Sequence, residues 1–389
     1  MDYEKILGQC VQDIPFSGIR KFFELLETMP GAISLSVGEP DYQTPWHIRE
    51  AGIYSLTKGF TKYTANAGLT ELRREICNYQ RRRFGLEYDW KTETLVTVGG
   101  SEAIDLGVRA LINPGEEVIV PQPSFVCYSP IAQLAGGVPV IVETKAENRF
   151  KLTADELRAA ITPKTKILVL PYPCNPTGGI MEKDDLEAIA EVLRGTNIMV
   201  LSDEIYAELT YGKRHVSIAS IDGMRERTIV VGGFSKAYSM TGWRLGYANG
   251  PAPIIKQMTK IHQYAIMCAP TTSQYAAVEA MRSGDADIEE MVEDYGQRRR
   301  YIIKRFRELG LDCFEAEGAF YVFPCIKSTG LSSEEFAEKL LREQQVAVVP
   351  GSAFGASGEG YVRCCYAASL KDIDEALDRI GRFLETHHA

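Results

Sequence analysis

Three short apolar runs constrain the fold of this chain more than any other feature of its sequence. They span residues 165–170, 197–202 and 228–232. Apolar runs of this length that alternate with helical segments indicate strands covered on both faces, and therefore a largely parallel sheet. The sequence thus predicts an α/β fold with helices on both faces of the sheet. Further strands are expected at 94–98, 117–120 and 138–142.

The pattern changes after about residue 285, which indicates a second domain. A chain of 389 residues favours two or three domains. We predict a large domain over 46–284, a smaller α+β domain over 285–389, and an N-terminal arm over 1–45 that forms part of the small domain. Within the arm and the small domain, we expect helices at 17–27, 285–309, 332–343 and 370–386, and short strands at 33–37, 318–323, 346–349 and 361–366.

Composition and charge exclude several classes of protein. The net charge is −9 at pH 7, and no basic run is longer than the triplets at 81–83 and 298–300. Because a nucleic-acid-binding surface needs a basic patch, we expect no nucleic-acid partner. The N-terminus has no basic segment followed by an apolar one, and no stretch approaches 18 consecutive apolar residues. We therefore expect neither a signal peptide nor a membrane span.

Cysteine and histidine usage indicates a reducing compartment. The nine cysteines are an odd number with no CxxC pair, and the five histidines form no HExxH or clustered motif. We therefore expect free thiols, a cytoplasmic location and no metal site.

A lysine follows the apolar run at 228–232, inside the glycine-rich stretch 232–246. An ordinary lysine is almost fully protonated at pH 7 and is a poor nucleophile. Partly desolvated beside another cation, Lys236 would lose its proton and could form a Schiff base. Ser235 and Arg244 would suit a phosphate group next to it. This combination suggests pyridoxal phosphate, and the alternative is a glycine-rich loop with a solvated lysine.

Other polar residues also follow predicted strands, where open α/β sheets bind their ligands. Gly100, Ser101 and Glu102 would open a helix whose N-terminus favours a phosphate, or would form an ordinary turn capped by the serine. Asn175 lies between prolines in the loop 171–179, where it either donates to a bound ring oxygen or serves a purely structural loop.

Two charged residues stand in apolar strands and need partners. Asp203 ends the run at 197–202, so its carboxylate would pair with a protonated pyridine nitrogen or would cap the next helix. Tyr206, three residues later, could reach the phenolic oxygen of such a ring. Arg363 lies in the apolar strand at 361–366 and would bind an α-carboxylate or form an internal salt bridge.

Taken in this order and spacing, the motifs resemble those of the class I/II pyridoxal-phosphate-dependent aminotransferases of fold type I. The resemblance is closer to the prokaryotic aspartate and aromatic aminotransferases, and it runs from Val37–Asp41 to Gly360–Arg363. Its most specific stretches are Asn175–Gly178, Ser202–Tyr206, Ser235–Lys236 with Gly242–Gly246, and Gly318–Tyr321.

The resemblance implies a role for each candidate residue. Lys236 would be the Schiff-base lysine and would move the proton between the substrate Cα and the cofactor. Tyr63 would reach the phosphate of the neighbouring subunit, which implies a homodimer with shared active sites. The remaining roles are as follows: Asp203 for the pyridine nitrogen; Asn175 and Tyr206 for the ring oxygen; Gly100, Ser101, Glu102, Ser235 and Arg244 for the phosphate; Phe125 for stacking on the ring; and Gly38, Phe125, Asn175 and Arg363 for the substrate.

Two positions depart from the pattern of the family. Phe125 stands where a Trp or Tyr is often found, which removes a polar tip but keeps a stacking face. Glu102 stands where many relatives have Gln. Because an acid beside a phosphate is unfavourable unless it points away, we expect Glu102 to act through its backbone.

The sequence therefore predicts an enzyme that exchanges an amino group between an amino acid and a 2-oxo acid such as 2-oxoglutarate. The donor is expected to be aromatic or of broad range, with aspartate as the alternative, because no second arginine motif offers a cation for a distal carboxylate. Two other functions stay open: a β-eliminating carbon–sulfur lyase on the same fold, and a pyridoxal-phosphate-binding regulator. The regulator would need a DNA-binding domain, for which the sequence before the first motifs leaves no room.

Overall fold

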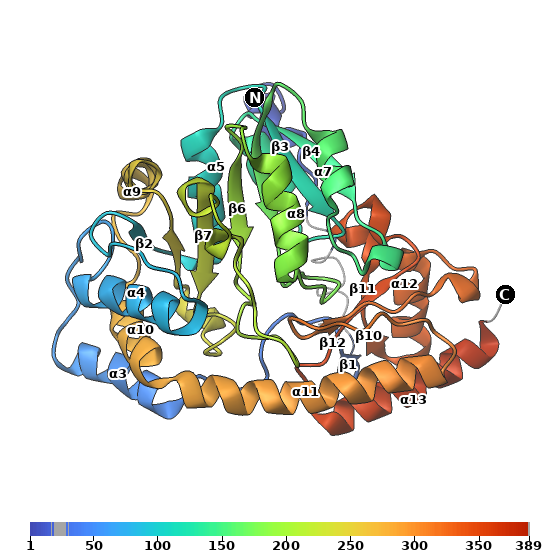
Figure 1. Ribbon diagram of the computed structural model, residues 1–389. Coiled ribbons are helices and arrows are strands. Elements are labelled where there is room, and N and C mark those ends of the chain that lie inside the picture. Colours follow the sequence, from blue (N-terminus) through green and yellow to red (C-terminus); the bar gives the residue numbers. More distant parts are fainter. Residues whose placement is uncertain (17, 19–28, 30, 388–389) are drawn as a thin grey trace.

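A seven-stranded mixed sheet forms the centre of the molecule in this computed structural model, which describes residues 1–16, 18, 29 and 31–387 (Figure 1). Neighbouring strands are parallel except where β8 (Gly246–Asn249) pairs with β2 and β7. The mostly parallel sheet is therefore confirmed. The strand order is β2 (Thr94–Thr97), β8, β7 (Thr228–Gly233), β6 (Met199–Asp203), β5 (Thr165–Leu170), β3 (Glu117–Gln122) and β4 (Val138–Glu143).

Helices cover both faces of the sheet, as the apolar runs predict. Alternate residues of β5 enter opposite cores: Ile167 and Val169 pack in one cluster, whereas Leu168 and Leu170 pack in the other. The first cluster includes residues of α5 (Gly99–Leu111), α6 (Tyr128–Leu134) and α9 (Ala252–Ala265). The second includes residues of α7 (Ala154–Ala160) and α8 (Lys183–Leu193). A strand buried on both faces needs apolar side chains at every position, so its sequence does not alternate.

Three further helices pack together at the β2 end of the sheet. They are α3 (Trp46–Thr57), α4 (Thr70–Phe84) and α10 (Thr271–Ser283). Their buried side chains share a core with Phe234 and Tyr238, which follow β7. This core therefore fixes the segment that carries Lys236.

The smaller part of the molecule is built around the long helix α11 (Asp285–Glu308), which runs beneath both parts in Figure 1. An antiparallel sheet has the order β11 (Val349–Pro350), β12 (Val362–Cys365) and β9 (Tyr321–Val322). The helices α12 (Ser333–Gln344) and α13 (Leu370–Thr386) pack against this sheet and α11.

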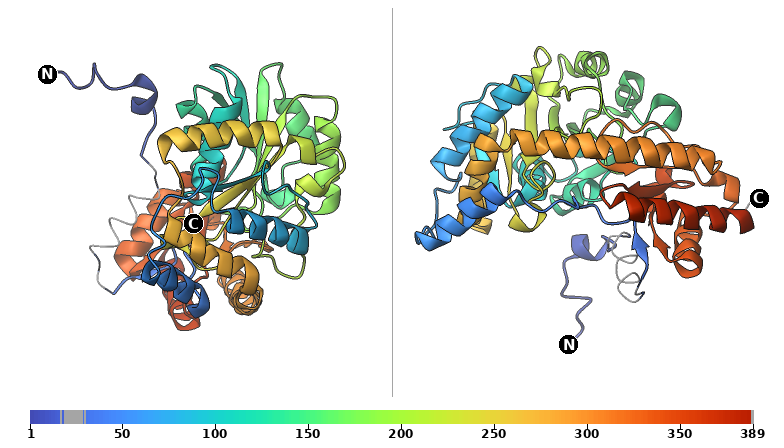
Figure 2. Two further views of the ribbon diagram at one scale, coloured as in Figure 1. Left: turned by 90° about the vertical axis from the view of Figure 1, so that its left-hand side faces the viewer. Right: turned by 90° about the horizontal axis from the view of Figure 1, so that it is seen from below.

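The N-terminal segment reaches this smaller part through one strand pair. β1 (Ile33–Ser34) pairs in parallel with β10 (Val346–Ala347), and the short helix α1 (Gln9–Gln12) projects from the body of the molecule (Figure 2). The helix expected at 17–27 lies, apart from Gly18, outside the described residues. The domain boundaries at residues 45 and 284 stay predictions.

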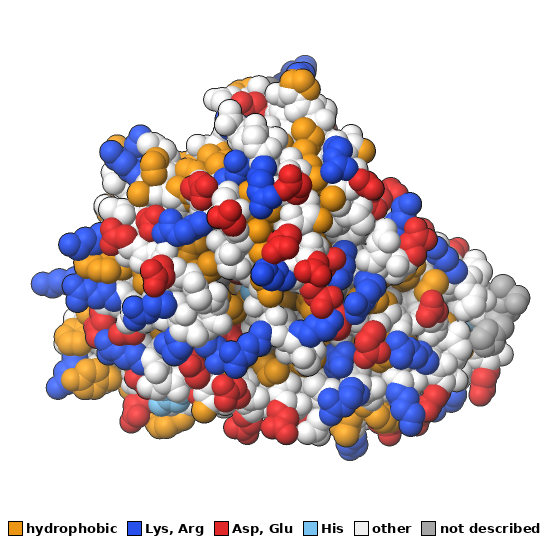
Figure 3. Space-filling model, viewed as in Figure 1, with side chains coloured by type: hydrophobic (Ala, Val, Ile, Leu, Met, Phe, Trp, Pro, Cys, Tyr) orange, Lys and Arg blue, Asp and Glu red, His pale blue; other side chains and the backbone are white. Residues whose placement is uncertain are grey.

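Two general features concern the described helices and the surface of the molecule. None of the described helices combines the length and the apolar character needed to cross a membrane. Basic and acidic side chains are intermixed on the face shown in Figure 3.

The strand β8 brings Gly246 into close contact with Gly99 and Gly100, which lie far from it in the sequence. A Cβ atom on Gly246 would lie 2.5 Å from the carbonyl carbon of Gly99 and 2.7 Å from the amide nitrogen of Gly100. The backbone turn that leads from β2 into α5 therefore requires glycine at the first position of β8.

Replacement of Gly246 by Ala is expected to lower the free energy of unfolding by about 1–3 kcal/mol, because the backbone must shift to admit the methyl group. Gly242→Ala is the matched control, since a Cβ there would have no heavy atom within 4 Å. Thermal unfolding midpoints of the two variants measure the difference. Equal midpoints would show that the contact between β8 and the α5 turn is not tight.

Candidate active site

A cavity of about 650 Å³ lies at the carboxyl ends of β2, β5, β6 and β7. Tyr321 of β9 and Arg363 of β12 reach it from the smaller part of the molecule. Most of the predicted site residues line this cavity: Gly38, Gly100, Ser101, Phe125, Asn175, Asp203, Tyr206, Ser235, Lys236, Arg244 and Arg363. The topology thus brings together residues that are up to 325 positions apart, from Gly38 to Arg363.

Lys236 follows β7, and its ammonium group donates a hydrogen bond to the carbonyl oxygen of Gly38 at 2.5 Å. Burial is the main cause that lowers the pKa of Lys236 from 10.5 to about 8, and the cations Arg363 and Arg244 lower it further. Its amine therefore loses the proton far more readily than an exposed lysine does. No carboxylate of the described residues pairs with it.

Asp203 ends β6 and is buried without a cationic partner among the described residues. Its carboxylate accepts hydrogen bonds from the Tyr128 hydroxyl at 2.7 Å and from the Ile205 amide at 3.2 Å. Burial raises the pKa of Asp203 despite these two bonds. A ligand that carries a positive charge or an N–H group would compensate the buried carboxylate.

Arg363 is 3% exposed, and its acceptors in the described part of the chain are neutral. Its Nη1 donates to Asn175 Oδ1 at 2.9 Å, and its Nη2 donates to the Ser36 carbonyl oxygen at 2.6 Å, whereas its buried Nε has no partner among the residues that the structure describes. Since a guanidinium group cannot accept, the oxygen of the Asn175 amide must face it. The Asn175 NH₂ group is then left to donate to a ligand.

The turn between β2 and α5 forms a cradle with Arg244. A Cβ atom on Gly99 would lie 2.8 Å from Arg244 Nη2, so glycine allows the guanidinium group to approach the backbone. The first amides of α5 have no partner within the helix, and Ser235 lies on the same cavity. Helix N–H groups, a hydroxyl and a guanidinium group together form a typical site for a phosphate.

Tyr206 and Tyr321 line the cavity next to Gly38. Their hydroxyl groups are 2.9 Å apart, and a Cβ on Gly38 would lie 2.6 Å from the Tyr321 hydroxyl. Phe125 lines the same cavity and packs edge-on against Tyr128. These aromatic rings give the cavity an apolar wall.

Two predicted residues do not line the cavity. The Glu102 carboxylate points away from it and accepts hydrogen bonds from the Val98 amide and from His262, as expected for an acid near a phosphate site. Tyr63 is 81% exposed on this chain. Its predicted role toward a neighbouring subunit stays a prediction.

Sequence reasoning did not identify Tyr128 and His262, which support Asp203 and Glu102. Tyr128 lies three residues after Phe125 on the start of α6, and nothing local connects it with Asp203. His262 stands in the amphipathic helix α9 as an isolated histidine. Both contacts depend on how distant elements pack.

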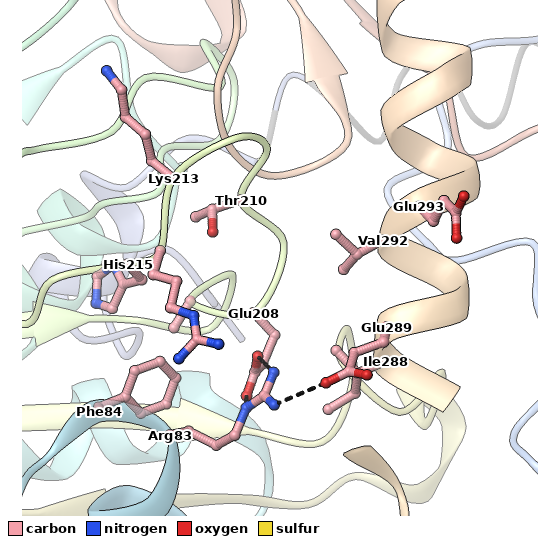
Figure 4. Close-up of a pocket in the computed structure, with 12 residues that line it drawn as sticks. Arg83, Phe84, Glu208, Thr210, Lys213, His215, Ile288, Glu289, Val292 and Glu293 are labelled. Carbon is pink, nitrogen blue, oxygen red and sulfur yellow. Dashed lines mark hydrogen bonds and ion pairs between the residues drawn. The ribbon is translucent and has the colours of Figure 1, made fainter. Parts of the chain in front are cut away.

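A second cavity, of about 480 Å³, lies between α4, the segment after β6 and α11 (Figure 4). Three of the charged side chains that line it, Arg83, Glu208 and Glu289, pair with one another. Arg83 donates two hydrogen bonds to Glu208, at 2.9 and 2.7 Å, and a third to Glu289 at 3.4 Å. The first cavity is the better candidate because Asp203, Lys236 and Arg363 in it have no ion-pair partner among the described residues.

Comparison with known proteins places the chain in a family. Residues 30–380 match the family described as aminotransferase class I and II. The putative aminotransferase YugH of Bacillus subtilis is 54% identical over 378 residues, which cover 97% of this chain and 98% of the relative. An aspartate aminotransferase of Pyrococcus abyssi is 47% identical over 371 residues, or 95% of both chains.

A solved structure agrees with these matches. The aromatic aminotransferase of Pyrococcus horikoshii aligns with a TM-score of 0.90 and 46% identity, covering 94% of this chain and 99% of that one. The chain belongs to the class I and II aminotransferases, enzymes that use pyridoxal phosphate, and within them to the aspartate and aromatic subfamily.

Proposed function

We propose that this aminotransferase takes the amino group from aromatic and other uncharged amino acids and passes it to a 2-oxo acid. The observation that carries the proposal is the number of cations in the cavity. Among the described residues that line it, only Lys236, Arg244 and Arg363 are positively charged. Each has a use that does not involve the substrate side chain, so none is left for a distal carboxylate.

Pyridoxal phosphate fits the residues that the cavity presents. The uncompensated Asp203 carboxylate would meet the pyridine nitrogen, and the free Asn175 NH₂ group and the Tyr206 hydroxyl would meet the ring oxygen. Gly100, Ser101, Ser235, Arg244 and the backbone of Glu102 would hold the phosphate, with Phe125 on the face of the ring. The unpaired polar atoms described above support these assignments.

The bound cofactor supplies an aldehyde carbon that takes the amino group and a ring that withdraws electrons from the substrate Cα. Residues of the protein would move the proton and bind the substrate. Lys236 would carry the proton to and from Cα, since its lowered pKa brings it near the working pH of a general base. Arg363 would bind the α-carboxylate through its planar fork, beside Gly38 and Asn175.

The lining of the cavity supports an uncharged donor side chain. Val37, Phe125 and Tyr321 contribute apolar surface, whereas Glu39 adds a negative charge at the cavity. A carboxylate in the substrate side chain would lie without a cation among the described lining residues, and an unpaired charge in a partly buried site is costly.

A homodimer with shared active sites is part of the proposal. The helix α3 and the loop after it expose several large apolar side chains, which a second subunit would cover. They are Trp46, Ile53, Tyr54, Leu56, Phe60 and Tyr63. Tyr63 would then reach the phosphate of the partner's site. A cytoplasmic location is proposed because all nine cysteines, which lie in the described ranges, are free thiols.

The lowered pKa of Lys236 has a direct test in the protein without cofactor. Because a lysine acylates only when neutral, the rate of acylation of Lys236 by acetic anhydride should rise with pH around a midpoint of about 8. The same peptide in unfolded protein should show a midpoint near 10.5. Mass spectrometry of the Lys236 peptide measures both rates, and equal midpoints would contradict the desolvated lysine.

The donor is tested by a single turnover of the loaded enzyme with one amino acid and no acceptor. Phenylalanine or tyrosine should yield its 2-oxo acid at least about tenfold faster than aspartate does, since one unpaired charge costs more than 1.4 kcal/mol. Chromatography of the 2-oxo acids measures the rates. Faster reaction of aspartate would refute the uncharged donor.

The Lys236→Ala variant is the control for this experiment. It keeps the phosphate cradle, Asp203 and Arg363 but has no group to move the Cα proton. It should form no 2-oxo acid from any donor on the same timescale. Equal turnover by this variant would contradict the role proposed for Lys236.

A further inference from the structure

Glu102 and His262 form a buried pair directly behind the first turn of α5. The Glu102 side chain is 11% exposed, and the His262 side chain, which comes from α9, is not exposed at all. His262 Nδ1 lies 2.7 Å from Glu102 Oε1, and the Val98 amide donates to Glu102 Oε2 at 2.5 Å. Both carboxylate oxygens are therefore occupied by groups outside the cavity.

The pair lies where a free carboxylate would interfere most with the binding of a phosphate. Glu102 belongs to the first turn of α5, whose unpartnered N–H groups attract any nearby anion. A carboxylate that swung toward Gly100 and Ser101 would compete for these amides and repel a phosphate. The first turn can serve a phosphate only if the Glu102 side chain is kept away from it.

The surroundings of His262 explain how the Glu102 side chain is kept away from the first turn of α5. Its Nε2 is buried and has no hydrogen-bond partner among the described residues. A hydrogen on Nε2 would thus be unsatisfied, which favours the tautomer with its hydrogen on Nδ1. In that tautomer, Nδ1–H donates to Glu102, and the direction of the carboxylate is fixed from α9.

We propose that His262 and Glu102 act as positioning residues for the phosphate of the cofactor. His262 holds the Glu102 carboxylate against the Val98 amide, which leaves the amides of Gly100 and Ser101 free. Neither side chain touches the phosphate. The inference rests on the proposed binding of the phosphate by the first turn of α5.

The main test is the affinity of the protein without cofactor for pyridoxal phosphate, measured by equilibrium titration of its absorbance. His262→Ala frees the carboxylate, so the dissociation constant should rise about 10- to 100-fold, the size of a charge–charge interaction at a partly buried site. The affinity for pyridoxal, which has no phosphate, should change less than twofold. Equal losses for both ligands would indicate general damage and overturn the inference.

Two further variants separate electrostatics from packing. Glu102→Gln combined with His262→Ala keeps the cavity left by the missing ring but removes the charge. This double variant should regain most of the lost affinity. His262→Asn, which keeps an N–H donor near the position of Nδ1, should stay within about threefold of the wild type. A double variant as weak as His262→Ala would overturn the inference.

The outcomes also distinguish this inference from the function on which it rests. If the wild type binds pyridoxal phosphate no more tightly than pyridoxal, the proposed phosphate site fails, and the inference fails with it. If the wild type binds pyridoxal phosphate much more tightly than pyridoxal, and the His262→Ala variant shows the same ratio of affinities, only the inference fails.

Discussion

Charged groups without a counter-charge among the described residues meet at the carboxyl edge of the central sheet, and the rest of the structure is arranged around them. Asp203, Lys236 and Arg363 are held by neutral donors and acceptors: a tyrosine hydroxyl, an amide side chain and backbone groups. Desolvation of such groups destabilises the empty protein. A ligand with a ring nitrogen and carboxylate groups supplies the missing partners, so the same desolvation favours binding.

The fold supports this arrangement from two sides. Strands buried on both faces end at one edge and place Asp203 and Lys236 on rigid backbone, with cores above and below the sheet. The smaller part adds Arg363 from β12, a strand whose neighbouring side chains are buried and apolar. The guanidinium group then lies against the ring of Tyr321, at 4.4 Å from its centroid. A planar cation held in this way matches a planar carboxylate.

The sequence predicts the elements whose signals are local. The apolar runs of β5, β6 and β7 identify the parallel sheet, and the helix expected at 370–386 is found with these bounds as α13. Asp203, Lys236 and Arg363 are recognisable because each interrupts or ends an apolar segment. Their convergence on one cavity follows from the rule that ligands bind at the carboxyl edge.

The features that the sequence does not predict depend on long-range packing. The strand β8 has the sequence Gly-Tyr-Ala-Asn, which carries no apolar run, and it forms because β2 and β7 both pair with it. Tyr128 and His262 have no local signal, because their partners come from other elements. The segments expected as single strands at 318–323 and 346–349 become shorter or divided, since the short β9, β10 and β11 pair only where β1 and β12 meet them.

The charges of the site have no counter-charge among the described residues until the cofactor binds. The Asp203→Asn variant tests this most directly. The amide oxygen can still accept from the Ile205 amide, and its NH₂ group can donate to the Tyr128 hydroxyl oxygen, but the side chain carries no buried charge. Without cofactor, the thermal unfolding midpoint of the variant should exceed that of the wild type, and pyridoxal phosphate should raise it by less than it raises the wild type. A variant that is less stable than the wild type without cofactor, yet equally stabilised by pyridoxal phosphate, would contradict the account.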